Sequence, residues 1–261
     1  MINNTIRCGN YTSSEIFKLQ KTGKGENGFG AAAITYIKEK NLERKLGRSI
    51  RTDAYAKAMA WGTLVERYVF EEKLGMEYEI HSKTTDCHPT ILFWCGSKDL
   101  IVAGIKVGEI KCYEPKNFAQ YTDALSTEDV NIIRHECPEE YWQIVSNAII
   151  NQVSKGEAIT YIPYKSELPL IREFASNYDG EDQWKYRFIT ESNDDVLPWI
   201  PDNGYYKDLN RFEFDIPQED IELLTANIIK AGKMLINQPP LILMADRDPE
   251  LSAVVERNQI N

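Results

Sequence analysis

The sequence predicts an α/β (α+β) fold in which a central mixed β-sheet is flanked by helices. Helical patterns of apolar residues cover residues 31–46 and about 53–74. Between residues 77 and 112 the pattern changes to short, apolar, β-branched segments separated by glycines, which is typical of strands. The chain shows no internal repeat and no clear linker, so we expect one domain spanning residues 1–261.

The N-terminal part of the chain predicts a short helix and a loop before the first long helix. Thr12, Ser13 and Ser14 precede an amphipathic run that starts at Glu15, as expected of an N-cap followed by a helix. Residues 22–30 are rich in glycine, but no strand precedes them. We therefore interpret them as a loop rather than as a nucleotide-binding motif.

The remaining elements follow from the same patterns. Strands are predicted at 90–95, 99–103, 107–113, 157–164 and near 185–190. Helices are predicted at 115–124, 138–153 and about 217–236, and residues 191–210 are interpreted as an insertion or long loop. The resulting domain has its core in about residues 7–165, followed by a C-terminal extension, about 166–261, to which the sequence assigns no role.

The composition indicates a soluble, cytoplasmic protein. Its 261 residues are 43% hydrophobic, enough for one sizeable core, yet no run of about 18 apolar residues predicts a membrane span. The five scattered cysteines favour a reducing compartment. The net charge of −10 opposes binding to nucleic acid, although basic residues cluster between Lys18 and Arg51. An acidic exterior with a basic channel would reconcile the two observations.

Four Glu-x-Lys patterns occur, and their surroundings separate them. Glu43 and Glu71 begin two of them in charged helical stretches, where solvated salt bridges are the ordinary explanation. The one at Glu114 begins a helix after a turn. Only Glu109-Ile110-Lys111 lies within an apolar strand, where alternation places the Glu109 and Lys111 side chains on one face.

Asp99 begins the preceding strand, so a hairpin can bring it within reach of the same cation as Glu109. Two carboxylates alone would repel a phosphodiester. A hard divalent cation bound by oxygen ligands would reverse the local charge, polarise the phosphate and activate water. Lys111 would then orient or deprotonate that water and stabilise developing charge. The alternative is an ion pair at a strand edge beside an unrelated aspartate.

With its surroundings, this pattern resembles the lambda exonuclease, or YqaJ-like viral recombinase, branch of the PD-(D/E)XK nuclease superfamily. The similarity covers roughly residues 7–155 and is carried by AKAMAWGTLVE, ending in Glu66, by Ser97-Lys98-Asp99 and by Glu109-Ile110-Lys111-Cys112. Asn117-Phe118 and the glutamine of EEYWQIVSNAII add to it. Lys98 replaces the proline that is common in the family.

The resemblance implies a restriction-endonuclease-like fold and a set of site residues. The catalytic residues would be Asp99, Glu109, Lys111, Glu66 and Gln143. The ligands of Mg²⁺, for which Mn²⁺ may substitute, would be Asp99, Glu109, Ile110 and Glu66. A pocket for the 5′-phosphate would comprise Arg7, Ser14, Ser97 and Lys116, of which Lys116 is one position off in loop length. A guanidinium fork and a helix N-terminus both suit an anion.

The function implied is 5′-to-3′ digestion of double-stranded DNA ends, leaving 3′ single strands for an annealing recombinase in phage-type recombination. Related enzymes form ring-shaped trimers, so a homo-oligomer is expected, and no membrane is involved. Two alternatives stay open at this point. One is a structure-specific or restriction-like endonuclease of the same superfamily. The other is a non-catalytic module that binds DNA ends, although buried like charges without a metal would be costly in it.

Overall fold

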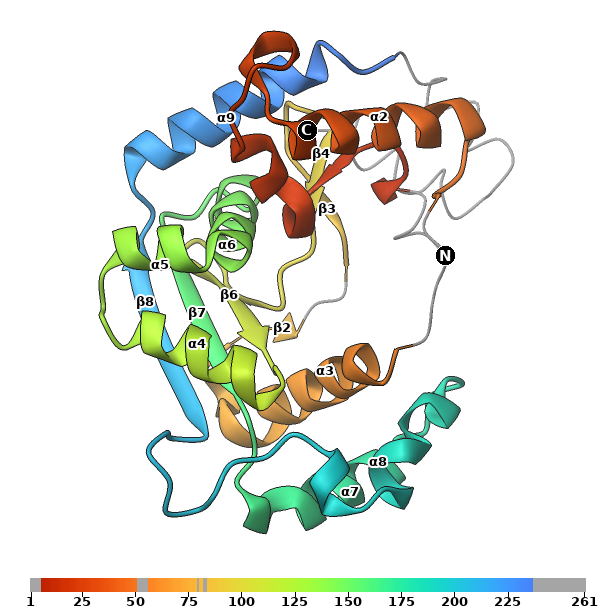
Figure 1. Ribbon diagram of the computed structural model, residues 1–261, viewed down its shortest axis with the longest axis vertical. Coiled ribbons are helices and arrows are strands. Elements are labelled where there is room, and N and C mark those ends of the chain that lie inside the picture. The colour runs from red at the N-terminus through yellow and green to blue at the C-terminus, as the bar shows by residue number, and fades with distance from the viewer. Residues whose placement is uncertain (1–5, 51–55, 79, 82–83, 237–261) are drawn as a thin grey trace.

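The structure is a computed structural model that describes residues 6–50, 56–78, 80–81 and 84–236. Figure 1 shows a central sheet with helices on both sides, and this confirms the predicted mixed α/β class. The strands are β1 (Tyr11–Thr12), β2 (Ile80–His81), β3 (Asp86–Cys87), β4 (Trp94–Gly96), β5 (Leu100–Val102), β6 (Lys106–Lys111), β7 (Lys155–Tyr161) and β8 (Leu209–Asp215).

The α-helices are α2 (Ala31–Leu46), α3 (Lys57–Tyr68), α4 (Pro115–Leu125), α5 (Val130–Glu136), α6 (Pro138–Ile150), α7 (Leu168–Ser176), α8 (Arg187–Glu191) and α9 (Gln218–Gly232). A 3-10 helix, η1, covers Ser13–Gln20, and a π-helical turn, Val69–Lys73, continues α3. None of the described helices is both long and apolar enough to cross a membrane.

The larger sheet has the strand order β2-β5-β6-β7-β8. Strands β5 and β6 form an antiparallel hairpin, β6 and β7 run parallel, and β8 returns antiparallel to β7 along the edge. A parallel pair requires a crossover connection, and here the crossover carries α4, α5 and α6. The smaller sheet, β1-β4-β3, lies beside it.

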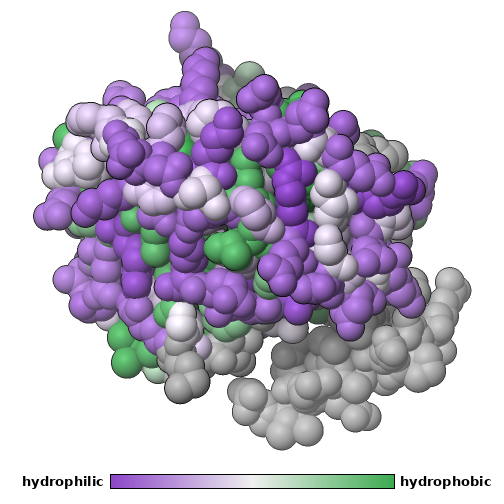
Figure 2. All heavy atoms as spheres, turned by 90° about the horizontal axis from the view of Figure 1, so that it is seen from below, coloured by the Kyte–Doolittle hydropathy of each residue, from purple (hydrophilic) through white to green (hydrophobic). Residues whose placement is uncertain are grey.

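Two apolar cores stabilise the larger sheet. The first contains Val107 of β6 and packs against α6, and it extends to α2, α9 and η1. The second contains Ile110 of β6, with apolar residues of α3 and α7 around it. Because neighbouring residues of a strand point to opposite faces, β6 contributes to both cores. Hydrophilic side chains predominate on the face seen in Figure 2, with hydrophobic ones in small patches between them.

Several element boundaries differ from the sequence prediction, and the type of one predicted element was wrong. The strand predicted near 185–190 is a 3-10 turn, Gln183–Tyr186, followed by α8. Tyr186 and Ile189 are both buried, and their spacing of three residues is helical. Strand β8 and helices α5 and α7 were not predicted. The helix expected at about 53–74 is α3 with its π-helical turn, and residues 51–55 lie outside the described residues.

Candidate active site

The hairpin of β5 and β6 brings Asp99 and Glu109 together. Leu100 pairs with Gly108 in the antiparallel register, so Asp99 lies beside the next residues of β6. Its Oδ2 atom accepts a hydrogen bond of 2.8 Å from the main-chain N–H of Ile110. Because side chains alternate along a strand, Ile110 points into the second core and Glu109 points to the opposite face.

Glu109 and Lys111 share that face, as the sequence predicted. Lys111 Nζ lies 2.8 Å from Glu109 Oε1 and donates a second hydrogen bond of 3.1 Å to Gln143 Oε1 of α6. The Gln143 amide in turn donates to Glu109 Oε1. Glu109 is buried, with 2% of its surface exposed. The structure therefore joins Asp99, Glu109, Lys111 and Gln143 in one polar cluster between β6 and α6.

Burial and mutual repulsion shift the acid–base properties of this cluster. Burial, followed by the charges of Glu109 and Glu66, raises the pKa of Asp99 well above its ordinary value. Burial also raises the pKa of Glu109, although Lys111 opposes the shift. For Lys111, burial is outweighed by Glu109 and Asp99, and its pKa is raised. Lys111 is thus held as an ammonium, which donates hydrogen bonds and stabilises negative charge.

Glu66 lies on α3, on the other side of the hairpin. It is half-buried, and its charge contributes to the raised pKa values of Asp99, Glu109 and Cys112. The structure thus brings Glu66 within electrostatic reach of the carboxylates from β5 and β6, while its role as a ligand stays a prediction.

The donor atoms of the cluster suit a hard cation. Within the described ranges, no three His, Cys, Asp or Glu side chains are grouped closely enough to hold a metal ion. The protein's own contribution would then be Asp99 and Glu109 with the main-chain carbonyl of Ile110, and Glu66 nearby. Mg²⁺ is commonly held by one or two carboxylates and keeps several waters, so this set fits it. A bound cation would also relieve the repulsion that raises the pKa of Asp99.

The residues expected to bind the 5′-phosphate are only partly brought together. Arg7 Nη2 lies 3.4 Å from Ser14 Oγ in the first turn of η1. Ser97 directly follows β4, and its hydroxyl bonds to Thr85 Oγ1 at 3.0 Å. Lys116 is exposed in the first turn of α4, and within the described part of the chain no hydrogen bond or ion pair joins it to Arg7. Arg7 and Ser14 are the two members of the expected pocket that the structure brings into contact.

Lys98, at the position where the family that the sequence resembles commonly has a proline, has a structural role. It is buried and forms an ion pair with Asp86 of β3. The pair connects the segment between β4 and Asp99 to the edge strand of the smaller sheet. The lysine therefore anchors this segment by an ion pair.

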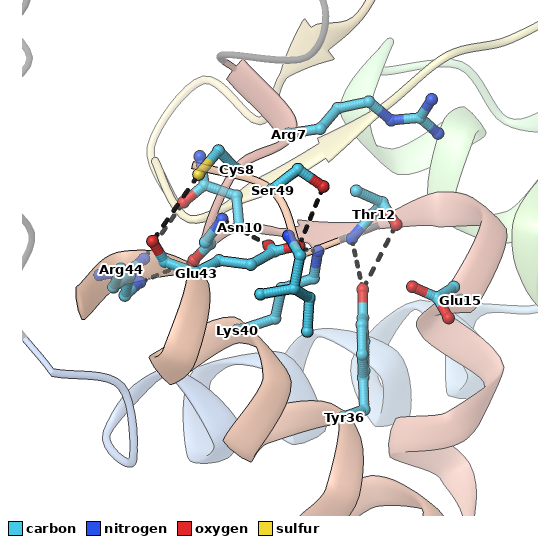
Figure 3. A network of polar contacts seen from close by, with 12 residues as sticks. Arg7, Cys8, Asn10, Thr12, Glu15, Tyr36, Lys40, Glu43, Arg44 and Ser49 are labelled. Carbon is cyan, nitrogen blue, oxygen red and sulfur yellow. Dashed lines mark hydrogen bonds and ion pairs between the residues drawn. The ribbon is translucent and has the colours of Figure 1, made fainter. Parts of the chain in front are cut away.

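The segment that carries Arg7 is held by a buried charged network on α2, drawn in Figure 3. Glu43 Oε2 accepts hydrogen bonds from Gly9 N at 2.8 Å and from Lys40 Nζ at 2.9 Å. Arg44 donates to Gly9 O at 2.6 Å and to Asn10 Oδ1 at 3.1 Å. The Arg7 side chain extends away from this network. The network thus fixes the main chain from which Arg7 projects.

This network corrects two sequence interpretations. Glu43 is not in a solvated salt bridge, because only 2% of its surface is exposed, and its partner Lys40 is 4% exposed. Lys40 and Arg44 were also counted among the early basic residues that could line a DNA channel. Their cationic groups instead donate hydrogen bonds within the protein, to the Glu43 carboxylate and the Gly9 carbonyl.

Asn147 is a site residue that sequence reasoning missed. It lies one helical turn after Gln143 on α6, and its Nδ2 atom reaches Glu109 Oε2 at 3.5 Å. The signal was available, because residues four apart on a helix share a face. A second amide at that spacing is therefore expected to contact the same group as the Gln143 amide, here the Glu109 carboxylate.

The fold is that of a class of solved exonucleases. LHK-Exo, an alkaline exonuclease from Laribacter hongkongensis, aligns over 96% of this chain and 94% of its own, with a TM-score of 0.53 and 15% identity. Its complex with dAMP aligns over 98% and 96%, with a TM-score of 0.55 and 15% identity. A phage-related exonuclease from Haemophilus somnus 129PT aligns over 86% and 92%, with a TM-score of 0.53 and 12% identity.

No family model and no curated protein sequence matches the chain. At 12–15% identity the structural likeness establishes a common fold, extending over nearly the whole length of both chains. The fold that the sequence resemblance implied is thereby confirmed.

Proposed function

We propose that this protein is a divalent-metal-dependent exonuclease that digests one strand of duplex DNA from its 5′ end. The observation that carries the proposal is the cluster of Asp99, Glu109, Lys111 and Gln143, buried where β6 meets α6. Its support is twofold: the cluster combines cation ligands with a fixed ammonium, and solved proteins of this fold are exonucleases. We propose Mg²⁺ as the metal, with Mn²⁺ able to replace it.

The cluster divides the chemistry between its residues. A bound divalent cation would polarise the scissile phosphate and lower the pKa of a coordinated water. Lys111, already protonated, would donate to the phosphate oxygens as negative charge develops on them. Gln143 holds both Lys111 and Glu109 and so fixes their relative orientation. Arg7 and Ser14 would bind the terminal 5′-phosphate through charge-assisted hydrogen bonds.

We further propose the cellular setting implied by the sequence resemblance. The product would be a 3′ single-stranded overhang, used by a single-strand annealing recombinase in phage-type recombination in the bacterial cytoplasm. A homo-oligomer, by resemblance a ring-shaped trimer, would keep the enzyme on its DNA. Size-exclusion chromatography with light scattering would test the trimer directly.

A gel assay on linear duplexes tests the proposal. The duplexes differ only in whether the 5′ end carries a phosphate or a hydroxyl, and closed circular DNA is the control. We expect Mg²⁺- or Mn²⁺-dependent release of nucleotides from the 5′-phosphorylated duplex and none from the circle. Cutting of the circle would favour an endonuclease. Intact linear DNA with folded protein and either metal would refute nuclease activity and favour a DNA-end-binding module.

A further inference from the structure

The Asn147 side chain contacts both the segment before Asp99 and the carboxylate of Glu109. Its Nδ2 atom donates to the main-chain carbonyl of Ser97 at 3.0 Å and lies 3.5 Å from Glu109 Oε2. Only 1% of the Asn147 surface is exposed. Ser97 precedes Asp99 by two residues, so the amide links the two chain segments that carry the carboxylates.

Two amides of α6 hold the two oxygens of Glu109. Gln143 donates to Oε1, and Asn147, one turn later, approaches Oε2. A carboxylate held at one oxygen can rotate about that bond, whereas one held at both oxygens keeps the plane of its carboxyl group. Asn147 therefore adds orientation that Gln143 alone does not give.

The asparagine side chain leaves one of its own polar atoms unpaired at this position. Its Oδ1 atom is buried and has no hydrogen-bond partner among the described residues. An unpaired buried acceptor destabilises the folded state and offsets part of what the hydrogen bond to the Ser97 carbonyl contributes. The space is also tight, because a Cβ atom on Gly96 would lie 2.3 Å from Asn147 Oδ1 and 2.0 Å from Ser13 Oγ. What this side chain provides is therefore the pair of contacts made by Nδ2, one of which reaches Glu109.

We propose that Asn147 is a positioning residue that sets Glu109 relative to Asp99 for the divalent cation. The inference rests on the proposed function and names a residue of the same site. In this role Asn147 would act through Glu109 and through the Ser97 carbonyl, not as a ligand itself. Partners of metal ligands typically contribute about 10- to 100-fold to metal affinity when they fix a ligand's orientation.

The test compares Mn²⁺ binding to wild type, Asn147→Leu and Asn151→Leu by titration calorimetry without DNA. Leucine branches at Cγ as asparagine does, although it is bulkier, and it removes both donors and the unpaired oxygen. Asn151 is a matched control, because it lies one turn further along the chain and bonds only to the main-chain oxygen of Asn147 in the described contacts. We expect the dissociation constant to rise about 10-fold for Asn147→Leu and to stay unchanged for Asn151→Leu.

A second readout separates positioning from general loss of structure. With Asn147→Leu, cleavage at limiting Mn²⁺ should fall while the rate at saturating Mn²⁺ recovers, whereas unfolded protein would lower both. Asn147→Ala, which leaves a void instead, is the second variant, and thermal melting identifies which variant is folded. Equal Mn²⁺ affinity in wild type and a folded Asn147 variant would overturn the inference, as would an equal loss in Asn151→Leu.

The outcomes also distinguish this inference from the proposed function. Wild type that binds Mn²⁺ without cutting DNA overturns the nuclease proposal alone, because the comparison of affinities still decides the role of Asn147. Wild type that binds no Mn²⁺ overturns both.

Discussion

Glu43 offers a direct test of the buried charged network on α2. The change is Glu43→Leu, which removes the acceptor of Gly9 N and Lys40 Nζ and leaves a shorter, apolar side chain. Lys40, with 4% of its surface exposed, then has a buried ammonium without the carboxylate that accepts from it. The expected loss is therefore larger than that of the carboxylate contact itself.

The magnitude follows from burial. Removing one partner of a buried ion pair typically costs about 3–5 kcal/mol, because the other charge is left uncompensated. A domain of this kind is stable by roughly 5–15 kcal/mol, so the variant would lose a large part of its free energy of unfolding. In Lys40→Met/Glu43→Leu both charges are gone, and the Gly9 N–H lacks its acceptor, at about 1–3 kcal/mol. The longer contacts of 3.4 Å from Ser49 Oγ and Ile50 N to Glu43 Oε1 are lost in the single and the double variant alike. The double variant should therefore be more stable than the single one.

Urea unfolding, followed through the fluorescence of the five tryptophans, measures these differences. The control is Glu71→Ala, from a Glu-x-Lys pattern of the same kind. The Glu71 side chain is 37% exposed and pairs with Arg67, so its loss should be at most about 0.5 kcal/mol. A loss below about 1 kcal/mol for Glu43→Leu would refute the reasoning from the buried ion pair. So would a double variant no more stable than Glu43→Leu.

Three further predictions address the site and the pH dependence. Lys111→Ala should lower the cleavage rate by about 100-fold or more while DNA binding, measured by fluorescence anisotropy, is kept; equal loss of both would make Lys111 a structural residue. Asp99→Asn should abolish cleavage. It should also raise the melting temperature of the metal-free protein at neutral pH, because burial and Glu109 raise the pKa of Asp99 and so disfavour its charged form. A lower melting temperature would contradict this. Hydrogen bonds from Arg211 lower the pKa of Glu77 below its ordinary 4.5, so Glu77 contributes stability above pH 4.5 that is lost as pH falls through its lowered pKa. The midpoint of urea unfolding should therefore fall less steeply with decreasing pH in Arg211→Leu than in wild type. An identical pH dependence in the two proteins would show that Arg211 does not lower the pKa of Glu77.

The elements that the sequence predicted well are those whose pattern is set by one face of the chain. Helix α2 was predicted at its observed bounds, and α4 differs by one residue, because each buries one stripe of apolar residues. Strand β8 was missed although Phe212 and Phe214 alternate with charged residues. Its partner β7 lies some fifty residues earlier, and a pattern of three or four residues does not identify so distant a partner.

The proximity of the two carboxylates could be predicted because they lie close together in the chain. Asp99 and Glu109 are ten residues apart and joined by a hairpin, so local alternation was enough to place both carboxylates. Glu43 shows the limit of that reasoning. Its acceptor role depends on Gly9, thirty-four residues away in the chain, and no helical pattern distinguishes a carboxylate that meets a main-chain N–H from one that meets water. Charges on α2 were therefore interpreted as exposed, although Glu43 and Lys40 are buried.

Helix α6 joins the two parts of the proposed site. Gln143 and Asn147 face Glu109, while Ser146, between them, accepts a hydrogen bond of 2.8 Å from Trp94 Nε1 and bonds to Ser13 Oγ at 2.8 Å. Ser13 precedes Ser14 of the proposed phosphate pocket. Positions 143, 146 and 147 have the spacing of one helical face, so a shift of α6 would move the carboxylate and the pocket together. In the proposed function, the distance between the terminal phosphate and the carboxylates would therefore be set by a helix rather than by a loop, which suits cutting at a fixed distance from a DNA end.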